Sequence, residues 1–274
     1  MVDVRVAQPG PRHPYSGAVL IIVPSSETKR AAPNRGKPVS LEGLSFPALN
    51  EVRAGILEAL IKTSAQPDAL ARLFAGDSLA GEVDRNLHLR GLPVRPALEV
   101  YTGTLHGGLD AATLSPSAAR RARTRIVIAS ALFGLLRPAD RIPPYRLNIC
   151  AHLVGLDGLE ATWRTVMPDV LAEAAGPRGV ILDLRAASYQ AMGMPTGMAH
   201  RVVTLRADGA DGGRVGNVFV KRARGEAARH LLESGKDPAT PKALAAVLGE
   251  RWPVRLDPPA RPGRPWTLAL LLPV

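Results

Sequence analysis

The segment Ser26–Lys29 carries polar side chains directly after the apolar run 18–23, and their types suit acid, base and phosphate chemistry. The hydroxyl of Ser26 and the ammonium of Lys29 are groups that hold a phosphate, and Glu27 is a candidate general base. Ligands of α/β proteins bind at the carboxyl ends of strands, so we predict an anion site here. A solvated turn with a capping serine is the alternative interpretation.

A second group of candidates lies in the segment Ser130–Leu147, where another apolar run passes into charged residues. Arg137 and Arg146 carry planar guanidinium groups that suit bidentate contacts with a phosphate or carboxylate. Asp140 and Tyr145 are acid, base or nucleophile types. A structural pair of Arg137 and Asp140 that holds the loop is the alternative. The candidate catalytic residues are therefore Glu27, Lys29, Asp140 and Tyr145.

Three further segments hold residue types that bind phosphates or rings. The candidates are Tyr101 and Thr102 in segment 99–103, Arg185 and Tyr189 in segment 183–189, and Lys221 and Arg224 in segment 221–229. Tyrosine stacks on rings, and the start of a helix attracts anions. The predicted ligand- or phosphate-binding set is Ser26, Lys29, Tyr101, Thr102, Ser130, Arg137, Arg146, Arg185, Tyr189, Lys221 and Arg224. Core tyrosines, a helix cap and a solvated charged helix start are the alternatives.

The composition predicts a folded protein with anionic partners. The chain has 274 residues, 46% of them hydrophobic, which is enough to bury a substantial core. Its formal net charge of +11 favours nucleic acid or other phosphate-bearing partners, because summed basic charge attracts phosphates. A genomic bias toward arginine is the alternative explanation of this excess.

The cysteine and histidine content argues against a metal centre. Cys150 is the single cysteine, and the six histidines show no H-x-H or H-x-x-x-H spacing, so we expect no disulfide, no metal and no cofactor. The apolar run 18–23 is too short for the core of a signal peptide or for a membrane span. We therefore expect a cytoplasmic protein without a membrane partner.

Two kinds of apolar pattern predict the elements that position these residues. Continuous runs at 18–23, 125–129, 180–184 and 266–271 are typical of buried strands, and 201–206 with 214–220 of a hairpin. Helical spacing occurs at 46–61, 68–75, 82–89, 117–124, 156–175, 223–233 and 241–249. This order predicts an α/β (mixed α+β) fold, in which a single compact domain at 18–274 has a mixed central sheet flanked by helices. A Pro-rich tail at 1–17 precedes it.

The polar segments, taken in order, resemble the motifs of a known family. They are Ser26-Glu27-Thr28-Lys29 for S-E-x-K, Val100–Gly103 for V-Y-T-G, Ser130–Leu147, Leu184–Tyr189, and Lys221–Gly225 for K-x-A-R-G. In this form and order they resemble the YaaA family of peroxide stress proteins, over residues 18–272. The resemblance implies a YaaA-type α/β fold with a basic cleft, binding of double-stranded and damaged DNA, and a role in limiting intracellular iron and peroxide damage.

Three hypotheses about function follow. The first is a stress protein that binds DNA or another phosphate-bearing ligand in a basic cleft lined by Lys29, Arg137, Arg146, Arg185, Lys221 and Arg224. The second is an enzyme that acts on a nucleotide or other small anionic substrate through Glu27, Lys29, Asp140, Tyr145 and Tyr189. The third is a non-catalytic basic interaction module. Carboxylates among the cations would repel a DNA backbone, which favours a small-ligand pocket.

Overall fold

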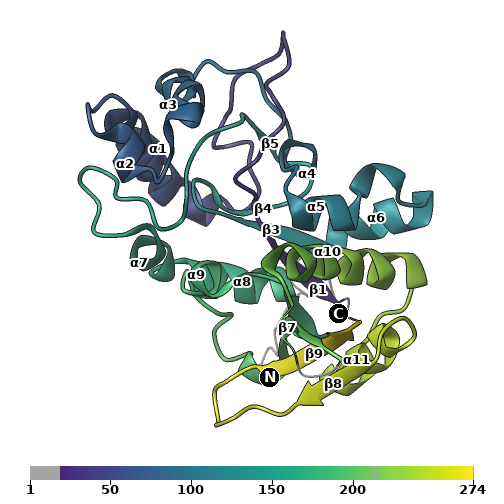
Figure 1. The fold of residues 1–274 in the computed structure, drawn as a ribbon. Helices are drawn as coiled ribbons and strands as arrows, with labels where there is room; N and C mark the ends of the chain where they lie inside the picture. Colours follow the sequence, from purple (N-terminus) through teal and green to yellow (C-terminus); the bar gives the residue numbers. More distant parts are fainter. Residues whose placement is uncertain (1–18, 211–212, 214, 274) are drawn as a thin grey trace, which may run out of the picture.

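The computed structural model describes residues 19–210, 213 and 215–273, and it places a seven-stranded sheet at the centre of the molecule (Figure 1). The strand order is β4-β3-β1-β6-β7-β9-β8. The strands are β1 (Leu20–Pro24), β3 (Ile126–Ser130), β4 (Gly134–Leu136), β6 (Ile181–Asp183), β7 (Val202–Gly209), β8 (Val254–Asp257) and β9 (Trp266–Leu272). A small second sheet pairs β2 (Arg95–Pro96) with β5 (Arg141–Ile142). The tail predicted at 1–17 lies outside the described residues.

The central strands of the large sheet are parallel. β1 pairs with β3 on one side and with β6 on the other, and β7 and β9 continue the parallel order. The antiparallel strands β4 and β8 close the two edges. The chain thus leaves β1 in one direction and later returns to its other side, which makes β1 the switch point of the sheet. Ligand crevices of open α/β sheets lie at this point, beyond the carboxyl ends of the strands.

Helices pack around the sheet and account for most of the remaining regular structure. They are α1 (Asn50–Ser64), α2 (Ala69–Arg72), α3 (Ala80–Arg85), α4 (Ala97–Val100), α5 (Thr104–Leu109), α6 (Pro116–Arg125), α7 (Leu159–Arg164), α8 (Met167–Ala175), α9 (Ala187–Gln190), α10 (Asn217–Ser234) and α11 (Pro241–Gly249). The group α1–α3 lies at one end of the molecule, and α11 with β8 and β9 lies at the other (Figure 1). The predicted mixed sheet flanked by helices is confirmed.

Two predicted elements differ from the structure. The second strand of the hairpin predicted at 214–220 is wrong, because residues 217–220 form the first turn of α10 and β7 pairs in parallel with β6 and β9. Val218 and Phe219 have the apolar sequence pattern of a strand, but both are exposed on that turn. The single helix predicted at 156–175 divides into α7 and α8, since Pro168 cannot donate a helical hydrogen bond and occupies the first turn of α8.

Helices α5 and α10 approach each other closely, and glycine permits the contact. A Cβ atom on Gly225 would clash with the carbonyl oxygen of Leu105 and lie 2.7 Å from the amide nitrogen of Leu109. Gly108 on α5 meets the carbonyl of Arg222 in the same way. Because α5 is only six residues long, this packing against a long helix fixes its position.

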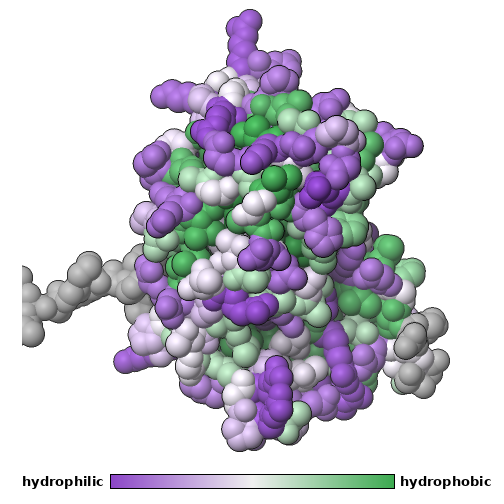
Figure 2. Space-filling view, turned by 90° about the vertical axis from the view of Figure 1, so that its left-hand side faces the viewer, coloured by the Kyte–Doolittle hydropathy of each residue, from purple (hydrophilic) through white to green (hydrophobic). Residues whose placement is uncertain are grey.

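The surface mixes polar and apolar residues. Over the face shown in Figure 2, hydrophilic side chains are interspersed with apolar ones. Within the described part of the chain, no helix combines the length and the apolar composition required to cross a bilayer.

Candidate functional site

The polar segment after β1 lies beside the segment around Tyr101. Lys29 and Tyr101 form an antiparallel bridge, and the amide of Arg30 donates to the carbonyl of Val100 at 2.8 Å. The amide of Thr102 donates to the carbonyl of Thr28 at 3.2 Å. Two of the segments that the sequence analysis singled out are therefore neighbours at the carboxyl end of β1.

A chain of buried hydroxyl groups runs beneath this bridge. The hydroxyl oxygens of Tyr101 and Tyr145 are 3.0 Å apart, and Ser130 Oγ lies 2.7 Å from the Tyr145 hydroxyl. Ser130 Oγ also accepts from the amide of Phe133. Burial raises the pKa of both tyrosines, so they remain protonated donors near neutral pH. Ser130 ends β3 and Tyr145 follows β5, which brings the second and third predicted segments to one place.

Lys29 lies over this hydroxyl chain. Its Nζ atom is 4.1 Å from the centroid of the Tyr145 ring and donates to the carbonyl oxygens of Ser26 and Glu27 at 2.8 and 3.3 Å. Burial, and then the positive charge of Arg146, lower the pKa of Lys29 to about 7, although the Glu27 carboxylate partly opposes this change. An amine with this pKa accepts and returns a proton at neutral pH, and its neutral form is a nucleophile.

Arg146 completes the group. Its Nη2 atom donates to Glu27 Oε2 at 2.8 Å, and Asn148 donates to the other carboxylate oxygen at 2.6 Å. Asn86 fixes the Arg146 backbone, because its side chain accepts from the amide and donates to the carbonyl of that residue. The Arg146 side chain is buried, yet its Nε atom has no hydrogen-bond partner among the described residues. We call Glu27, Lys29, Tyr145 and Arg146 the Lys29 cluster.

Tyr189 lies at the edge of the Lys29 cluster. Its hydroxyl is 2.9 Å from Ser25 Oγ, which links the first turn after β6 with the residue that follows β1. Burial raises the pKa of Tyr189, and the neighbouring Tyr145 raises it further. The fourth predicted segment therefore contributes one side chain to the same strand ends.

Asp140 and Arg137 hold their own loop in the structure. Asp140 Oδ1 accepts from the amide and hydroxyl of Ser45, and Oδ2 accepts from the amide of Arg137. The Arg137 guanidinium donates to the carbonyl of Thr124 and lies 5.2 Å from the centroid of the Phe46 ring. These contacts agree with the structural alternative for this segment, and they do not bring Asp140 into the Lys29 cluster.

The remaining predicted cations lie elsewhere. Arg185 is buried in a bidentate pair with Asp183, with both closest contacts at 2.8 to 2.9 Å. Arg224 points inward and donates to the carbonyl of Leu205 at 3.2 Å, and Lys221 is exposed on α10. Among the six cations predicted to line a basic cleft, these contacts group Lys29 with Arg146. The described residues do not show the predicted basic cleft.

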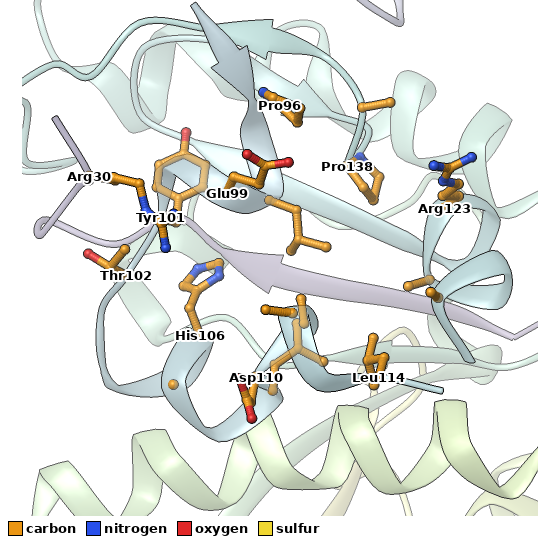
Figure 3. Close-up of a pocket in the computed structure, with 18 residues that line it drawn as sticks. Arg30, Pro96, Glu99, Tyr101, Thr102, His106, Asp110, Leu114, Arg123 and Pro138 are labelled. Atoms are coloured by element: carbon orange, nitrogen blue, oxygen red, sulfur yellow. The ribbon is translucent and has the colours of Figure 1, made fainter. Parts of the chain in front are cut away.

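A pocket of about 530 Å³ adjoins the Lys29 cluster (Figure 3). Tyr101 and Thr102 form one end of it, so two predicted binding residues line it. His106 and Glu99 also line it and were not predicted to have a function. The sequence holds no signal for His106, which stands in T-L-H-G-G without a second histidine at ligand spacing.

The donor groups of the site suit an anionic ligand. Lys29 and Arg146 offer cationic donors to a phosphate or carboxylate, and Tyr145 offers a hydroxyl. The described residues contain no group of three or more histidine, cysteine, aspartate or glutamate side chains placed to hold a metal ion.

Together, the switch-point strand and the polar side chains at its carboxyl end define a mixed α/β protein with its candidate site at the strand exits. Residues 19–254 match the model of the family described as peroxide stress protein YaaA, and the chain belongs to this family. It is 40% identical to a UPF0246 protein of Streptomyces coelicolor over 258 residues, which are 93% of this chain and 98% of the relative.

Two further relatives extend this similarity. A UPF0246 protein of Corynebacterium efficiens is 38% identical over 234 residues, covering 84% of this chain and 91% of the relative. A UPF0246 protein of Salinispora tropica is 30% identical over 253 residues, covering 89% of this chain and 92% of the relative. The predicted family is therefore confirmed.

Proposed function

We propose that this member of the peroxide stress family binds a small phosphate- or carboxylate-bearing ligand at the Lys29 cluster and acts on it as an enzyme. The observation that carries the proposal is the state of Arg146. Arg146 is 5% exposed, yet its Nε atom is buried without a hydrogen-bond partner among the described residues. A buried charged donor without a partner is costly, and an anionic oxygen beside it would remove that cost.

Each member of the cluster has a role in this proposal. Glu27 accepts a hydrogen bond from Nη2 of Arg146 and thereby orients the guanidinium group. Lys29 takes a proton from the bound ligand in its neutral form and returns a proton in its charged form. Tyr145 donates to a ligand oxygen, and the hydroxyl of Ser130 supports it from behind.

Other predicted binding residues fit around this core. Ser26 lies in the same turn as Lys29, although its hydroxyl is occupied by the carbonyl of Thr28. Tyr189 approaches from the end of β6 through Ser25. Arg185 and Asp140 are occupied by structural contacts, so we assign the reaction to Lys29 and the binding to Arg146 together with Lys29.

DNA binding is the other function that the family resemblance implies, and the formal net charge of +11 favours it. The two functions make different demands on the cations. A DNA backbone needs exposed arginines and lysines, whereas Arg146 is buried and paired with Glu27. The geometry of the Lys29 cluster therefore supports a small anion better than a duplex.

Isothermal titration calorimetry distinguishes these functions. The titrants are inorganic phosphate, a nucleoside monophosphate and a short DNA duplex, each at two salt concentrations. The proteins are the wild type, Lys29→Met, and Lys37→Met as a control at an exposed lysine. We expect Lys29→Met to weaken binding of the monophosphate at least about tenfold, since a charge-assisted contact contributes roughly 1.5–3 kcal/mol.

The control Lys37→Met should bind like the wild type. Equal affinity of the wild type and Lys29→Met for the monophosphate, or no binding of any small anion, would overturn the proposal. Duplex binding that weakens steeply with salt and is indifferent to Lys29→Met would instead support the DNA function.

A further inference from the structure

The pocket beside the Lys29 cluster has the size and walls of a small-molecule site (Figure 3). Its volume of about 530 Å³ lies within the range of roughly 300–1,000 Å³ that such sites occupy. Leu98, Leu109 and Leu114 contribute apolar walls, with prolines and alanines between them. These apolar walls suit a largely apolar ring system better than a flexible polar chain.

His106 presents a hydrogen-bond acceptor that the protein leaves unused. Its Nε2 atom lies 3.0 Å from the carbonyl oxygen of Pro24, and a carbonyl only accepts, so Nε2 carries the hydrogen. Burial lowers the pKa of His106 to about 4, and the charge of Lys29 acts in the same direction, so the ring is neutral. Nδ1 is therefore an unprotonated acceptor.

This Nδ1 atom is buried and has no partner among the described residues, in a side chain that is 7% exposed. A buried acceptor that is left unsatisfied destabilises the protein. The ring of His106 lines the pocket and lies against the ring of Tyr101, with centroids 5.5 Å apart. A ligand with an N–H or O–H donor at this end of the pocket would satisfy Nδ1.

The charged residues that line the pocket indicate further groups that a ligand would carry. Glu99 provides a second acceptor, an exposed carboxylate that forms no ion pair within the described part of the chain. Arg30 and Arg123 lie on opposite sides of the pocket in Figure 3, and both are exposed. A ligand that matches all of these groups carries N–H donors on a flat ring and an anionic group at its periphery.

We propose that this pocket binds an amino-substituted aromatic heterocycle of purine type, whose N–H groups donate to His106 and Glu99. Tyr101 joins the pocket to the Lys29 cluster, because its ring lines the pocket while its hydroxyl contacts Tyr145. The inference names the ligand class of the proposed function, and it rests on that function only for the anionic group. The ring specificity depends on His106 and Glu99, which line the pocket outside the Lys29 cluster.

The experiment compares nucleosides that lack a phosphate. Adenosine and guanosine carry an amino group, and purine riboside is adenosine without its amino group. Calorimetry should give binding of at least one aminopurine nucleoside, with purine riboside at least about tenfold weaker, as expected when a buried acceptor loses its donor. Equal binding of purine riboside and both aminopurines would overturn the proposal.

Variants locate this binding. Ala112 lines the pocket and is exposed, so Ala112→Trp should block the pocket without disturbing the core and should abolish nucleoside binding. Ala161→Trp, at an exposed position of α7, is the matched control and should bind normally. His106→Phe should lose the preference for the amino group. If Ala112→Trp binds nucleosides like the control, the pocket is not the site.

Nuclear magnetic resonance reads the acceptor directly. With 15N-labelled histidine, the Nδ1 resonance of His106 in the free protein should be that of an unprotonated nitrogen, and it should shift when the nucleoside donates to it. Nucleoside binding that needs His106, together with phosphate binding that ignores Lys29→Met, would uphold this inference and overturn the proposed function. Phosphate binding that needs Lys29, with no nucleoside binding, would do the reverse.

Discussion

The Nζ atom of Lys29 lies 4.1 Å from the centroid of the Tyr145 ring, although Lys29 follows β1 of the large sheet and Tyr145 follows β5 of the small one. The face of the ring attracts a cation, whereas burial and the charge of Arg146 oppose it. The result is a lysine with a pKa of about 7 held beside a tyrosine whose pKa is raised. At neutral pH, the pair therefore combines a proton acceptor with a proton donor.

The first prediction concerns the reactivity of Lys29. The neutral amine is the nucleophile, so acylation of Lys29 by an anhydride should reach half its maximal rate near pH 7. The exposed Lys37 is the comparison site, and it should react more slowly than Lys29 at that pH. Quantitative mass spectrometry of both sites across the pH range checks this. A Lys29 profile that coincides with that of Lys37 would contradict the prediction.

The second prediction concerns stability and pH. The folded pKa of Lys29 is about 7 and the unfolded value is about 10.4, so between these values the unfolded chain binds the additional proton. The free energy of unfolding of the wild type should therefore rise relative to Lys29→Met as the pH increases from about 7 to about 9, and the difference should be constant below about pH 6. Urea unfolding at each pH measures it. The opposite slope would refute the lowered pKa.

The third prediction separates structural from ligand-binding arginines. Arg185 is 1% exposed and paired with Asp183, so Arg185→Leu leaves a buried carboxylate alone and should cost about 3–5 kcal/mol. Arg72 forms an exposed pair with Asp68, and Arg72→Met should cost less than about 1 kcal/mol. Urea unfolding compares the two variants.

A control tests the reason for this loss. Replacing both Asp183 and Arg185 with leucine removes the lone charge, so the double variant should recover most of the stability that Arg185→Leu loses. If the double variant is no more stable than the single one, the cost has another origin.

The strands and part of the site were predictable because their signals are local. The buried run 18–23 and the run 125–129 have the continuous apolar character of strands covered on both faces. Parallel strands bring their carboxyl ends to one edge, so Lys29 and Ser130 were expected near each other. In the structure Tyr145 contacts both residues, because its hydroxyl lies beside Ser130 Oγ and its ring lies under Lys29 Nζ.

Other features depend on contacts between distant residues that leave no local signal. Asp140 is a candidate acid by residue type. Its structural role in holding the loop becomes visible only through its hydrogen bond with Ser45, which lies 95 positions away in the chain. His106 becomes an acceptor only because α5 places Nε2 against the carbonyl of Pro24. Val218 and Phe219 follow a strand pattern, yet the two sides of β7 are already occupied by β6 and β9.

The last prediction tests how α5 is positioned. Gly225 on α10 contacts the backbone of α5 at Leu105 and Leu109, so the methyl group of Gly225→Ala requires the two helices to separate. We expect a loss of about 1–3 kcal/mol of stability or more. Gly55→Ala is the matched control, because Gly55 is also helical and a Cβ atom there meets nothing within 4 Å.

The control should gain about 0.5–1 kcal/mol from the better helix propensity of alanine. Because α5 carries His106, separation of the helices should also move the ring away from the Pro24 carbonyl, and the Nδ1 resonance of His106 should change in Gly225→Ala but not in Gly55→Ala. A Gly225→Ala protein as stable as the wild type, with an unchanged His106 resonance, would mean that the close approach of α5 and α10 does not position this side of the pocket.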